Sequence, residues 1–343
     1  MKVSIANVFV KNGDMEYNYN LFKKFYDKSL EQKDDFIIFP RMFLCGPKND
    51  FSDKDFIYKN IDFLKDIVDL TQEKNTAILI GGIYYLDPYV KDGINYDSVT
   101  NDSAFFIKDG YLEDIISRKE YSKVNNFNDY RYFDKELYLK NFQFKKNKFS
   151  VFISDDIYRD ENIFLIKSQN TDFLLCLDST LNENSTIENR LIKISKFYRK
   201  PIIYLNNATF FDDSFLNGDV FVIDENQNVL ISDNYKIDRL YTVHLNYEDG
   251  SEVCIKDKID NVMDNKHSLL NKLSEIENKK VLFVNGNLCE NHNLINNYEQ
   301  KEVNFSDYCK IYNELDCNNK KLIEKIILDH LFGKDYIYEE IKN

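Results

Sequence analysis

The sequence predicts an α/β protein with one large domain over residues 1–250. Short apolar runs alternate with amphipathic polar stretches, as strands interleaved with helices do. The chain has 343 residues and is 43% hydrophobic, so it can bury a large core. No Pro/Gly/Ser-rich linker interrupts this pattern before about residue 250. The Asn-rich remainder, residues 251–343, is predicted to be a C-terminal extension that packs on the domain or on a partner.

The first half of the chain predicts strands, helices and a hairpin in alternation. Strands are expected at residues 3–10, 35–40 and 76–85, and helices at residues 18–30 and 53–71. In both helices the apolar residues recur every three or four positions, which predicts one buried face. Residues 103–107 and 111–117 flank the turn Lys108-Asp109-Gly110, a pattern typical of a β-hairpin.

The second half resumes the alternation after an Asn-rich, aromatic segment at residues 120–133. Strands are expected at residues 148–154, 173–178, 202–206, 220–224 and 229–232, and a helix at 186–198. A polar turn at residues 224–228 joins the last two strands. The extension ends in a predicted helix at residues 322–331, which Gly333 would cap.

The charge balance limits the classes of partner. With 45 basic and 58 acidic side chains, the net charge of −13 repels nucleic acid phosphates and anionic lipid head groups. The N-terminal apolar run lacks the basic region of a signal peptide, and no later run is long enough to span a membrane. We therefore expect a cytoplasmic protein without nucleic acid or membrane partners.

Cysteine and histidine spacing does not predict a metal site. The six cysteines form no CxxC pair, and the four histidines are scattered singly. Buried, reduced thiols are the simplest interpretation of the cysteines. No cofactor is expected.

Three motifs resemble the signatures of the nitrilase (carbon-nitrogen hydrolase) superfamily. They are Phe36-Ile-Ile-Phe-Pro-Arg41, the run from Ser117 to Phe133 that ends Phe127-Asn-Asp-Tyr-Arg-Tyr-Phe133, and Val151-Phe-Ile-Ser-Asp-Asp-Ile157. Within that superfamily they look most like the glutaminase domain of glutamine-dependent NAD synthetase. The resemblance implies a four-layer αββα sandwich of nitrilase type.

The resemblance also implies that the catalytic residues are replaced. Arg41 stands where the family carries its general-base glutamate, and a guanidinium stays protonated and cannot accept a proton. Ser154 stands where the family carries its nucleophilic cysteine, and a serine hydroxyl needs a competent base. The family's lysine position falls on Arg118 or on Lys119, depending on a one-residue gap. Either would supply a positive charge to an oxyanion.

Three acidic residues are candidate binding groups in the same frame. Asp155 and Asp156 follow Ser154 directly and could balance the arginines. Asp213 stands in the place of a family glutamate, in a segment where Thr209 and Phe210 fill positions of paired glycines. The cluster would form either an internal salt bridge that fills the site or a pocket for a small anion. The aromatic group around it is expected to pack: Tyr121, Phe127, Tyr130, Tyr132 and Phe133.

The favoured hypothesis is a catalytically inactive homologue of the glutamine amidohydrolase domain, acting as a structural or regulatory subunit. It would form a homo-oligomer or a complex with an active relative. One alternative is an active amide hydrolase that releases ammonia from glutamine or a related amide with a rearranged site. Another is a sensor that binds a small anion. No phosphate loop of a synthetase module occurs in the chain, so ATP chemistry is not expected.

Overall fold

The computed structural model describes residues 1–48, 50–91, 94–121, 129–180, 184–211, 214–233, 239–248 and 252–262, and two short strands further on. The chain divides into two compact units. The first comprises Met1–Thr209 and Leu216–Asp264, and the second comprises Phe210–Phe215 and Asn265–Asn343. In the second unit, β18 (Val281–Phe283) pairs antiparallel with β19 (Lys301–Val303).

A seven-stranded sheet forms one half of the first unit, in the order β17-β16-β1-β2-β3-β6-β7. Its first three strands in the chain are parallel to one another, and the others join it antiparallel. The strands are β1 (Lys2–Asn7), β2 (Phe36–Ile38), β3 (Ala77–Leu86), β6 (Val99–Lys108), β7 (Tyr111–Ser117), β16 (Arg239–Glu248) and β17 (Glu252–Val262).

A six-stranded sheet forms the other half, in the order β15-β14-β11-β10-β9-β8. Its strands are β8 (Asn141–Phe144), β9 (Asn147–Ile153), β10 (Phe173–Asp178), β11 (Ile202–Asn206), β14 (Val220–Ile223) and β15 (Val229–Asp233). Two small two-stranded sheets accompany them. One pairs β4 (Tyr89–Lys91) with β5 (Ile94–Tyr96), and the other pairs β12 (Ala208–Phe211) with β13 (Ser214–Asn217).

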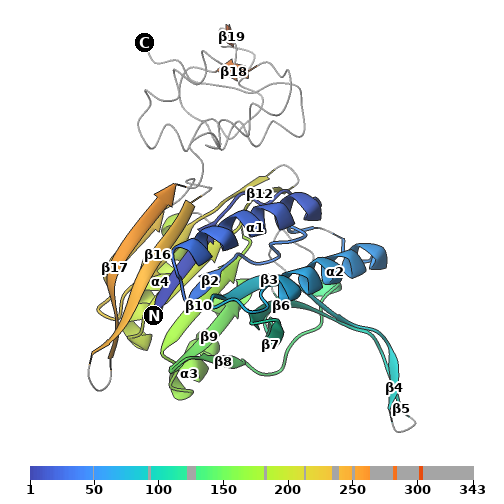
Figure 1. Ribbon diagram of the computed structural model, residues 1–343, viewed down its shortest axis with the longest axis horizontal. Coiled ribbons are helices and arrows are strands. Elements are labelled where there is room, and N and C mark those ends of the chain that lie inside the picture. The colour runs from blue at the N-terminus through green and yellow to red at the C-terminus, as the bar shows by residue number, and fades with distance from the viewer. Residues whose placement is uncertain are drawn as a thin grey trace. The chain divides into compact units, whose positions relative to one another are not determined.

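Four α-helices cover the two sheets (Figure 1). They are α1 (Met15–Glu31), α2 (Lys54–Leu70), α3 (Asp160–Ser168) and α4 (Asn184–Tyr198), and two 3₁₀ helices, η1 (Asp129–Arg131) and η2 (Ser154–Tyr158), lie in loops. Asp14 and Asp53 cap the N-termini of α1 and α2, because their carboxylates accept hydrogen bonds from backbone N–H groups of the first turn. No helix of the described residues is long and apolar enough to cross a membrane.

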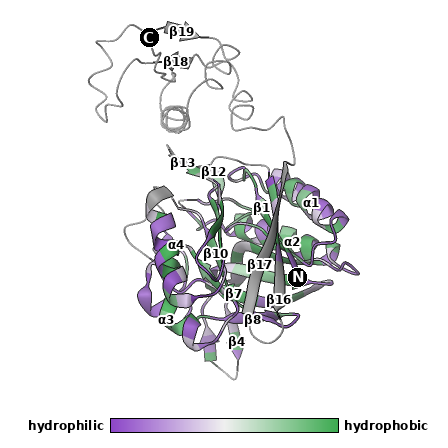
Figure 2. Cartoon of the chain, turned by 90° about the vertical axis from the view of Figure 1, so that its left-hand side faces the viewer, coloured by the Kyte–Doolittle hydropathy of each residue, from purple (hydrophilic) through white to green (hydrophobic). Residues whose placement is uncertain are grey.

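Strand alternation produces the four layers. In β2, Phe36 and Ile38 pack in a core shared with the strands of the other sheet, whereas Ile37 packs in a second core with α1 and α2. A third core joins the far face of the six-stranded sheet to α3 and α4. Figure 2 shows largely hydrophobic strands, and helices that carry both hydrophilic and hydrophobic residues. The predicted four-layer αββα sandwich is therefore confirmed.

Most predicted elements of the first half are present. The hairpin of β6 and β7 turns at Asp109 and Gly110, both with positive φ, as a tight hairpin requires. Several elements were not predicted, among them α3, β8, β16 and the pair β4–β5. The strand β17 lies in the segment assigned to the extension, yet it pairs along β16 and extends the large sheet past residue 250. The helix expected at residues 322–331 lies outside the described residues.

Candidate functional site

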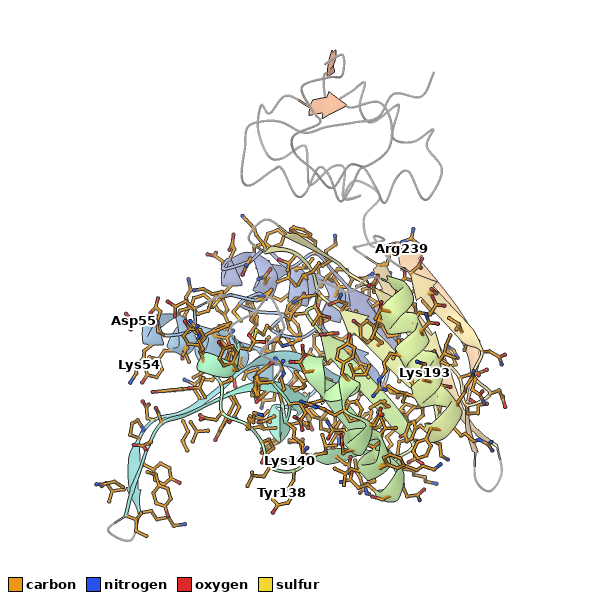
Figure 3. All side chains as sticks on the ribbon, turned by 180° about the vertical axis from the view of Figure 1, so that it is seen from behind. Lys54, Asp55, Tyr138, Lys140, Lys193 and Arg239 are labelled. Atoms are coloured by element: carbon orange, nitrogen blue, oxygen red, sulfur yellow. The ribbon has the colours of Figure 1, made fainter. Side chains whose placement is uncertain are left out.

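Two buried arginines lie at the centre of the first unit. Arg41 follows the end of β2, and Arg118 follows the end of β7; the residues are 0% and 1% exposed. By contrast, the charged side chains of Lys54, Lys140 and Lys193 point outward (Figure 3). Fully buried arginines are rare unless they are paired, so their partners define the site.

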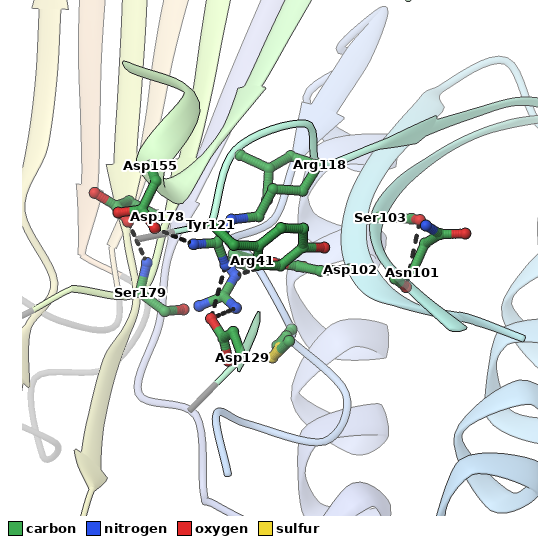
Figure 4. A network of polar contacts seen from close by, with 12 residues as sticks. Arg41, Asn101, Asp102, Ser103, Arg118, Tyr121, Asp129, Asp155, Asp178 and Ser179 are labelled. Atoms are coloured by element: carbon green, nitrogen blue, oxygen red, sulfur yellow. Dashed lines mark hydrogen bonds and ion pairs between the residues drawn. The ribbon is translucent and has the colours of Figure 1, made fainter. Parts of the chain in front are cut away.

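Three aspartates from three different elements bind these arginines (Figure 4). Arg41 donates from Nε to Asp102 Oδ2 at 2.7 Å and from Nη2 to Asp129 Oδ2 at 2.6 Å. Arg118 donates from Nη1 to the same two oxygens, at 3.1 and 2.7 Å, and from Nη2 to Asp155 Oδ2 at 2.5 Å. Asp102 lies in β6, Asp129 in η1 and Asp155 in η2, so the network joins both sheets.

The charges of this cluster stabilise one another. Burial alone would lower the pKa of Arg41, but Asp102 and Asp129 raise it above its ordinary value. Burial likewise lowers the pKa of Arg118, but the same two aspartates outweigh this effect and raise it well above its ordinary value. The guanidiniums keep the pKa of Asp129 below its usual value, whereas burial dominates at Asp102 and raises its pKa. Both arginines are therefore permanently protonated.

Aromatic rings cover the arginine pair. The guanidinium of Arg118 lies over the ring of Tyr121, 4.3 Å from its centroid. Tyr121 stacks on Phe133 with centroids 6.4 Å apart, and Phe133 contacts Phe51 at 4.8 Å. Tyr121 and Phe133 pack as the sequence predicted, while Tyr130 is 37% exposed and Phe127 lies outside the described residues. The rings remove water from one side of the cluster.

Lys119 points away from the two arginines. Its Nζ contacts Glu120 Oε1 at 2.8 Å and Asn162 Oδ1 at 3.2 Å, and its side chain is 21% exposed. The structure therefore brings Arg118, and not Lys119, beside Arg41. The sequence had left these two residues as alternatives.

Ser154 begins a tight turn directly after β9. Its φ is +50°, in the left-handed region that only glycine adopts freely. The residue is 3% exposed, and its Oγ has no hydrogen-bond partner among the described residues. The side chain thus occupies a strained backbone position without a polar contact that would compensate.

Asp156 has a different partner set from the one the sequence suggested. Its carboxylate accepts the backbone N–H groups of Ile153 at 3.1 Å, Lys119 at 3.1 Å and Glu120 at 2.7 Å. Burial raises the pKa of Asp156 to about 7, although these three donors act in the opposite direction. Asp156 therefore fastens the turn at Ser154 to the segment after β7, and Asp155 is the neighbour that balances an arginine.

A strained serine predicts an unusual mutational response. We expect Ser154→Gly to be more stable than Ser154→Ala by about 1 kcal/mol, because glycine alone removes the left-handed strain while both remove the unpaired hydroxyl. Thermal or urea unfolding of the two variants measures the difference. An alanine variant at least as stable as the glycine variant would show that the turn is not strained.

Two acids of the cluster were not predicted from the sequence. Asp129 belongs to the quoted run that ends at Phe133. Asp102 lies in β6 among polar neighbours, Thr100, Asn101 and Ser103, just before the apolar run from which the strand was predicted, so its local sequence gave no signal of burial. Asp213 lies outside the described residues. The described residues contain no group of His, Cys, Asp or Glu side chains suited to hold a metal ion.

Two features indicate the class of protein: the αββα sandwich and the polar cluster that lies beyond its strand ends. The family model for carbon-nitrogen hydrolase matches residues 2–209, which is more than half of the chain, and the chain belongs to this family. The chain is also 23% identical over 232 residues to the glutamine-dependent NAD(+) synthetase of Acinetobacter baylyi. That match covers 66% of this chain but 41% of the relative, so the chain spans less than half of the synthetase.

Solved structures show the same fold. The glutamine-dependent NAD+ synthetase of Acinetobacter baumannii, in complex with ADP, superposes with a TM-score of 0.62 at 20% identity. The superposition covers 79% of this chain and 50% of the A. baumannii synthetase. The amidase of Nesterenkonia sp. AN1, whose active-site cysteine reacts with acrylamide, has a TM-score of 0.57 at 12% identity. This superposition covers 68% of this chain and 89% of the amidase.

Proposed function

We propose that this chain is a catalytically inactive homologue of the glutamine amidohydrolase domain of NAD synthetase, acting as a structural or regulatory subunit. One observation carries the proposal. The centre of the site holds Arg41 and Arg118, buried and paired with Asp102, Asp129 and Asp155. This ion-paired cluster includes Asp155, the residue next to Ser154, at a place where an amidase needs a base and a substrate.

The family resemblance gives this cluster its meaning. If Arg41 corresponds to the general-base glutamate, the site has lost its proton acceptor, because a paired and buried guanidinium does not titrate. If Ser154 corresponds to the cysteine, the remaining hydroxyl has no hydrogen-bonded base among the described residues. Arg118 then fills the lysine position and binds three aspartates instead of an oxyanion.

A small-anion sensor is the weaker alternative. A bound anion would need an unbalanced positive charge, but the two guanidiniums face three carboxylates in the described part of the site. Five hydrogen bonds from the two guanidiniums, 2.5 to 3.1 Å long, already go to aspartate oxygens, and Arg118 Nε donates to the carbonyl oxygen of Glu120. An anion would have to displace a carboxylate, at a cost of several kcal/mol.

An active amide hydrolase with a rearranged site is favoured by one feature. Ser154 retains a left-handed turn at the end of a strand, which is a common geometry for an exposed nucleophile. Asp156, the neighbouring acid with a raised pKa, directs its carboxylate at three backbone N–H groups. It is therefore held in a structural role and is not free to activate the hydroxyl.

Ammonia release from glutamine tests the proposal directly. We expect the wild-type chain and Ser154→Ala to release ammonia at the same rate as buffer, because none of the described residues forms a hydrogen bond through which it could deprotonate the hydroxyl. A coupled glutamate dehydrogenase assay, with glutamine and simple aliphatic amides, measures this rate. Ammonia release by the wild type that Ser154→Ala abolishes would establish the hydrolase instead.

The regulatory part of the proposal has its own measurement. A mixture of this chain with an active glutaminase relative should form a complex, visible in sedimentation, and should change the relative's rate of ammonia release. The free, buried thiols of Cys45 and Cys176 and the acidic composition favour a cytoplasmic setting for such a complex. The matched control is a mixture of the same relative with this chain after the chain has been unfolded by heat.

A further inference from the structure

The strands β4 and β5 form an arm that extends beyond the large sheet. We define the arm as residues 87–91 and 94–97. It continues the hairpin of β3 and β6 but forms a two-stranded sheet of its own. Figure 1 shows it pointing away from the helices and sheets of the first unit.

The arm exposes large apolar side chains on both faces. Tyr89 and Tyr96 lie opposite each other and stack with centroids 4.7 Å apart, yet they remain 41% and 40% exposed. On the same face Ile94 is 57% exposed, and on the other face Val90 is 68% exposed. Tyrosine and aliphatic groups gathered on so short an element are typical of a protein interface.

A two-stranded sheet is marginally stable in water, and a third or fourth strand with an apolar face stabilises it. The outer edge of β4 pairs with no described strand. Because Pro88 lacks an N–H group, this edge offers the N–H of Val90 and the carbonyl oxygens of Pro88 and Val90 for pairing. A second copy of the same strand supplies a matching edge and the same apolar side chains. Two-fold symmetric pairing of this kind closes on itself.

The charges of the arm favour β4 as the pairing edge. Asp87 precedes β4 and Lys91 ends it, and both residues are exposed. Neither forms an ion pair with another described residue. When two β4 strands pair antiparallel about Tyr89, Asp87 of each copy lies opposite Lys91 of the other. The edge of β5 has Asp97 at one end and no base at the other.

We propose that two copies of this chain associate through their arms. The outer edges of β4 pair antiparallel, so that the two arms form one four-stranded sheet with two Asp87–Lys91 ion pairs. The tyrosine faces of both arms become continuous in this sheet. The contact is a homodimer interface that lies apart from the cluster of buried arginines.

Charge reversal tests this contact. Lys91→Glu and Asp87→Lys each place like charges opposite each other twice, and we expect each to weaken self-association on the order of tenfold. An equimolar mixture of the two variants restores both ion pairs in the heterodimer, so its dissociation constant should return close to that of the wild type. Sedimentation equilibrium at low salt measures all four samples.

The mixture also controls for damage to the arm itself. Asp87→Lys removes the hydrogen bond from the hydroxyl of Tyr58, which is 2.7 Å long, and this loss persists in the mixture. The proposal is wrong if the wild type shows no self-association. It is equally wrong if the single variants associate like the wild type, or if the mixture associates no more tightly than they do.

Disulfide trapping tests the register. Tyr89→Cys places two cysteines opposite each other across the symmetry axis, within the range that a disulfide spans, so mild oxidation should cross-link the dimer. Ile94→Cys is the matched control, since Ile94 lies on the same face but on β5. Cross-linking of Ile94→Cys in preference to Tyr89→Cys would overturn the pairing through β4.

Discussion

Replacing Arg41 by methionine is expected to destabilise the folded first unit by about 3 to 5 kcal/mol, the usual cost of removing one partner from a buried ion pair. The substitution leaves Asp102 and Asp129, both buried, with Arg118 as their remaining ion-pair partner among the described residues. Methionine keeps an unbranched apolar stem but is shorter than arginine, so the loss arises from uncompensated charge together with a small cavity. Urea denaturation followed by circular dichroism measures the change.

An exposed cation provides the matched control. Lys54 begins α2 and points into solvent, so Lys54→Met should change stability by less than about 0.5 kcal/mol. A double-mutant cycle separates charge from packing. In a chain that already carries Asp129→Asn, Arg41→Met should cost at least about 1 kcal/mol less than in the wild type. Equal costs in both backgrounds would contradict the ion-pair explanation.

The fold was predictable because its signals are local. In β2, Phe36 and Ile38 face one core and Ile37 another, and the short continuous apolar run between Asp35 and Pro40 indicates such a strand, buried on both faces. The helix α3 was missed because its four apolar residues are consecutive, at positions 163–166, and so show no helical period; the middle two, Phe164 and Leu165, are exposed, at 61% and 41%. The arm was missed because its strands bury no face, and burial is what produces a periodic pattern.

The site was predictable only in part, because its partners come from distant segments. Arg41 and Ser154 could be singled out as candidates because the motifs that contain them each span only a few residues. The choice between Arg118 and Lys119 could not be read from the motif, because a gap of one residue in the alignment exchanges them. Neighbouring residues of an extended chain point to opposite sides. Asp102 is 61 residues from Arg41 and was not found, because nothing in the chain near Asp102 indicates which cation it meets.

The second large effect on stability is expected at Gly81 in β3, an uncharged residue whose φ is not positive. A Cβ atom there would lie 2.4 Å from Arg41 Cα and 2.7 Å from both Met42 N and Pro40 O, all of them backbone atoms. The segment from Pro40 to Phe43 cannot move away without losing hydrogen bonds, because Gly81 N donates to Pro40 O and Phe43 N donates to Gly81 O. We expect Gly81→Ala to destabilise the protein by about 3 kcal/mol, measured by the same urea titration.

The neighbouring glycine separates this close approach from a general cost of alanine in the strand. At Gly82 a Cβ atom meets the ring of Phe105 at 3.0 Å, and no backbone atom is among its three nearest neighbours. Gly82→Ala should therefore cost less than half as much. Because Asn207 also holds the Arg41 carbonyl at 2.7 Å, a displaced turn must break that bond or the ion pair to Asp102. Gly81 thus determines where the arginine lies, and equal stabilities of the two alanine variants would show that it does not.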